Sequence, residues 1–334
     1  MSVIYLTKQG TYVTKERGRM VISDNQFELF STPWAKIESV VVFGNIQLTT
    51  QVISALLEHD IPTTFLTMEG ILKGQLITFR SKNTPLKLAQ FKAAIDDGIS
   101  MEIAKVIVIK KINNQLNIIK DFKSNHPEAD FFDEEYLLND TLSKVENMYV
   151  SGSNGAQTPE YNKQTLLGYE GIASKSYFSA LRKIFIGELK FDGRNKRPPK
   201  DEVNSLLSFG YTLLGIKISA ILHSKGLETG IGFFHSVEYG RESLMLDILE
   251  IFRQPAVDKL VINMCNKNML KKEDFEPREG GIYLKVDRME KFIKEFENWV
   301  GVLKESSQTF YQKIITQCNE LVSALENNKA FHTI

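Results

Sequence analysis

The first 80 residues carry short runs of β-branched and aromatic residues that alternate with glycine or polar turns. Such runs, bounded by turn residues, are typical of β-strands. The expected strands are VIYL, TYVTK, RMVIS, IESVVVFG, IPTTFLT and ILKGQLITF. Between the fourth and the fifth of these runs, TTQVISALLEHD spaces Val52, Leu56 and His59 as a helix does. The pattern therefore predicts a small β-rich domain that includes one helix.

Beyond Pro85 the apolar residues recur at the spacing of amphipathic helices almost to the end of the chain. The clearest helical segments are MEIAKVIVIKKINNQLNIIKDF and FFDEEYLLNDTLSKVENMYV, and SGSNGAQTPE, residues 151–160, is expected to be a loop. We therefore predict an α+β protein. Its small N-terminal β-rich domain covers residues 1–80, a linker covers 81–88, and a larger all-α-helical C-terminal domain covers 89–334. A chain of 334 residues is long enough for two such domains.

The segment LLGYEGIASKSYFSALRK places one carboxylate on the apolar side of a predicted helix. The apolar stripe consists of Leu166, Ala173, Tyr177 and Leu181. Glu170 follows Leu166 by one turn and lies on the same stripe. A carboxylate in an apolar interface is costly unless it is paired or binds a metal. Two interpretations therefore stay open for Glu170: a salt-bridged acid near the start of a helix, and a metal ligand.

The segment FFHSVEYGRESLMLDILE contains a histidine followed by a predicted helix with a narrow polar face. The polar positions on this face are Ser243, Asp247, Glu250 and Gln254. One interpretation is a solvated stripe, on which Arg253 pairs with Glu250 at the helix surface. The other is that Asp247 and Glu250 offer oxygen atoms to one cation, with His235 as a further ligand. Carboxylates with a single imidazole suit Mn²⁺ or Mg²⁺ better than zinc.

A basic loop precedes another long predicted helix. The cations of this loop are Arg194, Lys196, Arg197 and Lys200. Asp201 is expected to cap the helix that follows, and Gly226 to end it. Asn204 and Tyr211 lie on the same side of this helix. The loop is either a solvated charged segment or a surface that contacts phosphate. Asn204 and Tyr211 each either belong to the core or reach the same phosphate.

Composition and charge change this picture little. Hydrophobic residues make up 43% of the chain and charged residues 25%, which is ordinary for a globular protein. The 41 Lys and Arg residues balance 41 Asp and Glu residues, so net charge gives no indication of a nucleic-acid partner. No apolar run approaches the roughly 20 residues that span a bilayer, so we expect no membrane association. Cys265 and Cys318 form no paired motif, which favours a reducing, cytoplasmic location.

Taken in order, these segments resemble the CRISPR-associated integrase family, the adaptation endonucleases that insert new spacers into CRISPR arrays. The matching segments are ESVVVFGNIQLTTQ, IPTTFL, KINNQ, GYEGIASKSYFSAL, FDGRNKRPPKDEVNSLLSFGYTLL, GFFHSVEYGRESLMLDILEIFR, VDKLVINMCN and EDFEPREGGIYL. None of them is unique by itself, but their order and spacing together are specific. They extend along nearly the whole chain.

The resemblance implies a β-domain that forms a homodimer and a helical catalytic domain that holds Mn²⁺ or Mg²⁺. It implies Glu170, His235 and Glu250 as the metal ligands, with Asp247 as a neighbouring acid whose role is less uniform. The implied reaction is transesterification, in which the 3′-hydroxyl of an incoming double-stranded DNA attacks a phosphodiester of the CRISPR repeat. A small second adaptation protein is the implied partner.

Two other functions stay open. The first is a hydrolytic nuclease that acts on branched DNA without insertion, which analysis of the products for joined strands would distinguish. The second is a non-catalytic helical DNA-binding or assembly scaffold, whose acids form surface ion pairs only. Chelation with EDTA separates the scaffold from the enzymes, because only a metal-dependent reaction stops when the divalent ion is removed.

Overall fold

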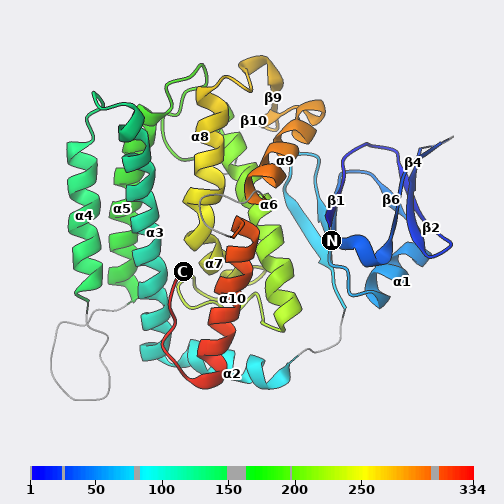
Figure 1. The fold of residues 1–334 in the computed structure, drawn as a ribbon, viewed down its shortest axis with the longest axis horizontal. Helices are drawn as coiled ribbons and strands as arrows, with labels where there is room; N and C mark the ends of the chain where they lie inside the picture. Colours follow the sequence, from blue (N-terminus) through cyan, green and yellow to red (C-terminus); the bar gives the residue numbers. More distant parts are fainter. Residues whose placement is uncertain (1, 25–26, 79–82, 149–162, 196–197, 302–307) are drawn as a thin grey trace. The chain divides into compact units, whose positions relative to one another are not determined.

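The computed structural model describes residues 2–24, 27–78, 83–148, 163–195, 198–301 and 308–334. The predicted loop at 151–160 and the basic residues Lys196 and Arg197 lie outside the described residues. The chain forms two compact units, which are Met1–Ser81 with Val286–Glu290 and Lys82–Lys285 with Lys291–Ile334. The first unit is rich in strands and the second is predominantly helical (Figure 1), which confirms the predicted α+β class.

The described strands of the N-terminal unit form two four-stranded sheets. The order of the first sheet is β1 (Ser2–Leu6), β5 (Ile37–Phe43), β7 (Thr63–Leu66) and β8 (Leu72–Leu76). The order of the second sheet is β4 (Glu28–Pro33), β3 (Arg19–Ser23), β2 (Tyr12–Glu16) and β6 (Gln47–Leu48). Strands β1, β5 and β7 run parallel, whereas β2, β3 and β4 form an antiparallel meander. Each predicted strand is present, and the sequence pattern missed β4 and β6.

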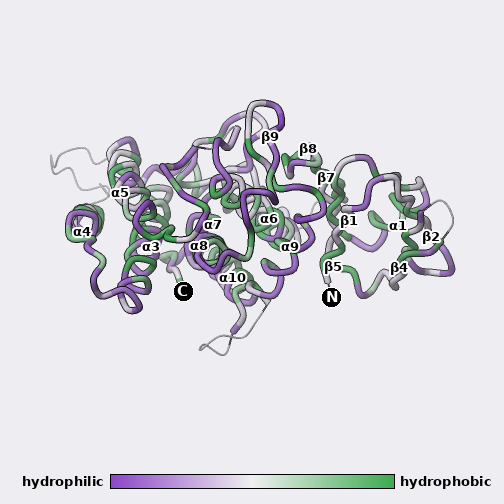
Figure 2. Tube along the Cα trace, turned by 90° about the horizontal axis from the view of Figure 1, so that it is seen from above, coloured by the Kyte–Doolittle hydropathy of each residue, from purple (hydrophilic) through white to green (hydrophobic). Residues whose placement is uncertain are grey.

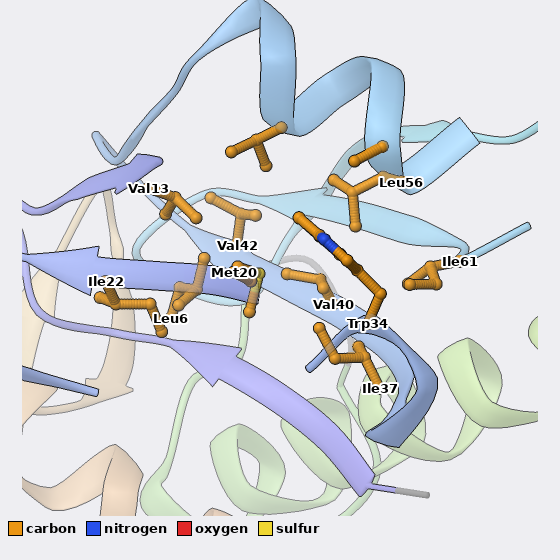
Figure 3. Packing of buried hydrophobic residues seen from close by; sticks show 12 residues of the cluster. Leu6, Val13, Met20, Ile22, Trp34, Ile37, Val40, Val42, Leu56 and Ile61 are labelled. Atoms are coloured by element: carbon orange, nitrogen blue, oxygen red, sulfur yellow. The ribbon is translucent and has the colours of Figure 1, made fainter. Parts of the chain in front are cut away.

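The core of the N-terminal unit is an apolar cluster to which strands of both sheets and helix α1 (Thr50–Glu58) contribute (Figure 3). Its buried members are Leu6, Val13, Met20, Ile22, Trp34, Ile37, Val40, Val42, Val52, Ala55, Leu56 and Ile61. Strand β5 is buried on both faces, because Val41 and Phe43 are as inaccessible as Val40 and Val42. A continuous β-branched run is the expected sequence of such a central parallel strand.

The helical unit contains a series of helices and one hairpin. The helices are α2 (Thr84–Ile95), α3 (Asp97–Asn125), α4 (Phe132–Glu146), α5 (Lys163–Ile184), α6 (Glu202–Lys225), α7 (Ser243–Arg253), α8 (Lys259–Asn266), α9 (Val286–Gly301) and α10 (Phe310–Asn327). The first residues of α9, Val286–Glu290, count with the N-terminal unit. A π-helical turn, Gln254–Asp258, joins α7 to α8. Two short 3-10 helices, Trp34–Lys36 in the N-terminal unit and Lys272–Asp274 here, complete the regular elements that are described.

Two local expectations for this part of the chain need correction. Helix α2 begins at Thr84, inside the segment expected as a linker, because the side chain of Asn83 accepts a hydrogen bond from the Leu86 backbone and caps the helix. The expected all-α domain also contains a hairpin of β9 (Phe275–Arg278) and β10 (Gly281–Leu284). Glu279 and Gly280 form its turn with positive φ angles of 45° and 75°, the backbone that a two-residue hairpin requires.

Helix α3 lies at the centre of the packing that positions the candidate site. It packs against α4, α5 and α7 (Figure 1). Helix α7 packs in turn against α6. Figure 2 looks down the axes of α3 and α4 and shows hydrophilic and hydrophobic positions on both, as expected of amphipathic helices. This arrangement brings α5 and α7, which carry the predicted acidic ligands, to the same helix.

Helix α6 is a core helix with the predicted ends. The Asp201 side chain accepts a hydrogen bond from the Asn204 backbone at 2.7 Å, and Gly226 ends the helix at a positive φ of 85°. Among the described helices, α6 is the one whose length and composition would allow it to cross a membrane. Most of its apolar stretch is buried inside the unit, which is the pattern of a core helix.

Candidate metal centre

The polar stripe of α7 points into the protein. Its members Ser243, Asp247, Glu250 and Gln254 are at most 3% exposed. The interpretation as a solvated stripe is therefore wrong, because α3, α6 and the π-helical turn pack around α7. Arg253 does pair with Glu250, with 2.9 Å between Nη1 and Oε1, but this ion pair is buried rather than on the helix surface.

A lysine of α3 joins the two predicted acidic ligands. Lys111 Nζ lies 2.9 Å from Glu250 Oε2 and also contacts Glu170 Oε1, so one ammonium group bridges α5 and α7. Ser174 Oγ donates a hydrogen bond of 2.7 Å to the same oxygen of Glu170. The Lys111 and Glu250 side chains are 5% and 4% exposed, and that of Glu170 is 20% exposed. Salt therefore screens these interactions less than it would screen surface ion pairs.

Lys111 is the residue of this site that the sequence analysis did not single out. It lies one turn after Ile107 and one turn before Gln115, and both of these neighbours are 1% exposed. A charged residue on a buried stripe is the same signal that identified Glu170. Two such residues of opposite sign are candidates for a buried ion pair, but the sequence pattern does not show that their two helices meet.

The positive charges around Glu250 keep it ionised. Burial by itself raises the pKa of this carboxyl group, but the charges of Arg253 and Lys111 outweigh burial and lower the pKa to about 2. The pKa of Arg253 shifts upward. Burial by itself lowers this pKa, but the charges of Glu250 and its other acidic neighbours together raise it by more. Glu250 is therefore an anion throughout the physiological pH range, as a metal ligand must be.

Asp247 holds His235 in a fixed orientation. Its carboxylate accepts backbone hydrogen bonds from Phe233, Phe234 and His235 at 2.6, 3.0 and 2.9 Å. A fourth contact, 2.7 Å, joins Asp247 Oδ1 to His235 Nδ1. Since the carboxylate accepts the proton of Nδ1, the lone pair of the ring is on Nε2. The backbone approaches closely at Gly232, where a Cβ would lie 2.8 Å from Asp247 Oδ2. This geometry assigns Asp247 to positioning the imidazole.

The donor atoms at this site fit a hard divalent cation. His235 Nε2 lies 4.0 Å from Glu250 Oε1. Glu250 Oε2 is buried and accepts no hydrogen bond of normal geometry from a described residue, although Lys111 is close to it. Among the described residues, no three histidine, cysteine or carboxylate side chains are close enough to hold an ion as they stand. The Lys111 ammonium lies between Glu170 and Glu250, and two carboxylates with one imidazole are ligands that Mn²⁺ and Mg²⁺ accept.

Asp258 forms a second buried anionic position at the end of the π-helical turn. Tyr177 donates a hydrogen bond of 2.8 Å to Asp258 Oδ2, and Tyr211 donates one to Oδ1. Burial raises the pKa of Asp258 and outweighs these two hydrogen bonds and the nearby arginines, which lower it. The guanidinium of Arg253 lies over the Tyr211 ring at 4.7 Å, so Tyr211 connects Asp258 to the ion pairs of the site.

Asn204 has a structural role in the basic loop. Its buried amide nitrogen donates hydrogen bonds to Gly193 and Asp201 at 2.7 and 2.6 Å. Its side-chain oxygen accepts one from Arg194 at 2.7 Å. The polar atoms of this side chain are therefore bonded inside the protein, which agrees with its interpretation as a core residue. Lys200 is exposed, with its ammonium 2.9 Å from the Gly280 carbonyl. Contact with DNA stays a prediction for the basic loop and for Tyr211.

Comparison with protein families gives a match along most of the chain. Residues 4–298 match the model of the family described as CRISPR associated protein Cas1. A CRISPR-associated endonuclease Cas1 of Thermodesulfovibrio yellowstonii is 36% identical over 280 residues, which cover 81% of this chain and 82% of that protein. A CRISPR-associated endonuclease Cas1 of Thermus thermophilus is 30% identical over 310 residues, which cover 92% of this chain and 86% of that protein.

Solved structures share the fold. A Cas1 protein from Thermotoga maritima superposes with a TM-score of 0.85 at 23% identity, over the full length of both chains. A casposase bound to its integration product superposes with the same TM-score at 24% identity, over 100% of this chain and 93% of that one. These likenesses agree with the β-rich and helical parts described above. On the family match and the relatives together, the chain belongs to the CRISPR-associated Cas1 family.

Proposed function

We propose that this protein is a divalent-metal-dependent DNA integrase and endonuclease that inserts DNA fragments into a CRISPR repeat. The observation that carries the proposal is the convergence of Glu170 and Glu250, from two helices, on one cationic group, with His235 Nε2 beside them. A pair of acids that already surrounds a positive charge is suited to bind a metal ion and the phosphate that the ion contacts. The name endonuclease, which the relatives bear, supports the same class of reaction.

In the proposed reaction the 3′-hydroxyl of the incoming strand attacks a phosphodiester of the repeat. A new bond forms between that oxygen and phosphorus while the bond to the leaving oxygen breaks, and the proton passes from the attacking to the leaving oxygen. Glu170, His235 and Glu250 would hold Mn²⁺ or Mg²⁺, which would stabilise negative charge on the phosphoryl oxygens. Asp247 keeps the imidazole in the orientation and tautomer that a ligand needs, and Arg253 keeps Glu250 ionised.

The experiment that tests this proposal uses the full-length protein, Mn²⁺, a double-stranded fragment with free 3′-hydroxyl ends, and a repeat-containing DNA. We expect Glu170→Ala and His235→Ala to reduce joining by about a hundredfold or more, since even outer-shell groups of metal sites contribute about 10- to 100-fold. Glu135→Ala is the matched control, because Glu135 also forms a lysine ion pair, 2.7 Å from Lys123, on α4. Full joining activity in Glu170→Ala or His235→Ala would refute the assignment.

Hydrolysis without insertion is the second candidate function, and the name endonuclease favours it. The same metal site would then activate water instead of a 3′-hydroxyl. Branched DNA labelled on each strand separates the two reactions, because only transesterification produces a labelled strand longer than either substrate. Unchanged processing of DNA in EDTA would instead favour the non-catalytic scaffold.

The proposal includes double-stranded DNA, a homodimer and a small second adaptation protein, Cas2, as partners. Strand β4 is the edge of its sheet, and it exposes Leu29 and Phe30 next to the exposed Phe27. An exposed apolar edge strand is a surface that pairs with another chain. We assign it to the homodimer, so Phe30→Glu should lower the molar mass measured by light scattering from that of a dimer to that of a monomer. An unchanged mass would place the dimer contact elsewhere.

We expect the protein to act in the cytoplasm, where CRISPR arrays are located. Its two cysteines, Cys265 and Cys318, are free and buried. Burial raises the pKa of each thiol to about 12, so both stay protonated and unreactive at neutral pH. Neither cysteine therefore takes part in the proposed chemistry.

A further inference from the structure

Lys111 occupies a position where a long helix would ordinarily carry an apolar residue. Its residue surface is 4% exposed, and its neighbours one turn away, Ile107 and Gln115, are 1% exposed. Burying an ammonium group costs several kcal/mol of hydration, which its partners must offset. A lysine in this environment therefore indicates a specific requirement for positive charge rather than for packing.

The requirement follows from the two carboxylates beside it. Glu170 comes from α5 and Glu250 from α7, and the same ammonium contacts one oxygen of each. Arg253 pairs with the other oxygen of Glu250, Oε1, and Lys111 is the cation beside Oε2. Without Lys111, the carboxylates of Glu170 and Glu250 would lose the cation between them, and their negative charges would repel each other. A compact ammonium suits this position, because it acts as a point charge between two acids.

We propose that Lys111 is an internal counter-cation that holds Glu170 and Glu250 together in the metal-free protein and withdraws when a divalent ion binds between them. The inference rests on the proposed function, because it takes these two glutamates as metal ligands. A metal ion and the ammonium compete for the same two oxygens, so each binding event must break both ion pairs of Lys111. Lys111 therefore lowers the affinity of the site for metal while it keeps the metal-free site assembled.

The test measures Mn²⁺ binding to full-length, metal-stripped protein by calorimetry, together with thermal unfolding in the presence and absence of chelator. We expect Lys111→Met to bind Mn²⁺ about tenfold more tightly or better than the wild type, because no internal cation competes with the metal. The metal-free variant should melt at a lower temperature than the metal-free wild type. Added Mn²⁺ should raise the melting temperature of the variant by more than it raises that of the wild type. Lys111→Arg, which keeps the charge, should not gain affinity.

Lys217→Met is the matched control. Lys217 is 7% exposed and pairs with Glu297 at 3.0 Å, so it is a buried, ion-paired lysine of the same unit outside the site. Its loss should lower the melting temperature and leave the Mn²⁺ affinity unchanged. If Lys111→Met does not fold, Lys111→Gln provides the same comparison, because its amide is neutral and can donate hydrogen bonds to both carboxylates.

The possible outcomes separate this inference from the proposed function. Equal or weaker Mn²⁺ binding by Lys111→Met or Lys111→Gln, with normal binding by the wild type, overturns the counter-cation role and leaves the metal site intact. Tighter binding by the charge-retaining Lys111→Arg overturns it as well. Absence of Mn²⁺ binding by the wild type overturns the proposed metal site, and the counter-cation role with it.

Discussion

The helical unit buries charged side chains as well as apolar ones, whereas the buried residues described in the N-terminal unit are apolar or uncharged. The cluster between the sheets of the first unit is apolar throughout, from Leu6 to Ile61. In the second unit, Lys111 and Glu250 are buried, and Arg253, whose side chain is 15% exposed, pairs with Glu250. Apolar burial is non-directional and grows with the area removed from water. Buried charges instead require matched partners at fixed positions, and removing one partner leaves the other uncompensated. The apolar cluster stabilises the fold, whereas the charged groups lie at the site for which we propose metal binding.

The largest effect is expected from placing a charged side chain in the apolar cluster of the N-terminal unit. Val40→Asp would place an unpaired carboxylate in the apolar cluster, where it has no described cation to pair with. The expected cost exceeds about 5 kcal/mol, because a buried charge without a partner is among the most destabilising changes. Chemical denaturation monitored by circular dichroism measures it, with Val40→Ala as the control. A variant that unfolds at the wild-type denaturant concentration would show that this cluster tolerates charge.

The converse change removes one charge from the ionic centre. Glu250→Gln should destabilise the metal-free protein by about 3 to 5 kcal/mol, because it leaves Arg253 and Lys111 without their shared anion. Adding Lys111→Met to this variant should cost less than the sum of the two single changes, with a coupling of about 1 to 3 kcal/mol. A double-mutant cycle of unfolding free energies in chelator checks this. Simple additivity would mean that the two residues do not stabilise each other.

A conservative deletion within the apolar cluster should have a moderate effect that is confined to stability. Leu56 of α1 is fully buried, and Leu56→Ala should cost about 2 to 5 kcal/mol through lost transfer energy and a cavity. The Mn²⁺ affinity of the helical unit should not change. Unfolding free energy and metal titration on the same preparation check both expectations, and a changed metal affinity would show that the two centres are coupled.

A change of pH tests the same ion pairs without a change of sequence, because it alters ionisation only. The pKa of Glu250 is about 2 in the folded protein, below its ordinary value of 4.5, so the ionised group stabilises the fold above about pH 4.5. That contribution is lost as the pH falls from about 4.5 towards about 2. The difference in unfolding free energy between the wild type and Glu250→Gln, measured in chelator, should therefore be constant near neutrality and shrink below about pH 4.5. A difference that stays constant at low pH would contradict the ion-pair account.

Regular periodicity explains which parts of the fold were predictable. The β-branched run of β5 and the capping residues of α6 are local signals, and the structure confirms both. Strand β4 was missed because its two large apolar residues, Leu29 and Phe30, are adjacent in sequence and do not alternate with polar ones. Both of them are exposed in the structure. The hairpin of β9 and β10 was missed because a helical pattern precedes and follows it and its strands are only four residues long.

The sequence by itself determined the longer helices and six of the strands, the β-then-helical order and the unusual position of Glu170 on an apolar stripe. These features depend on spacing along one chain segment, which helices and strands turn into faces. Only the tertiary structure decided that the polar stripe of α7 points inward, that the Asn204 side chain bonds to the loop before α6, and that Lys111 lies between Glu170 and Glu250. Those outcomes depend on which helices meet, and periodicity in one segment contains no information about the charge that a distant segment places opposite it.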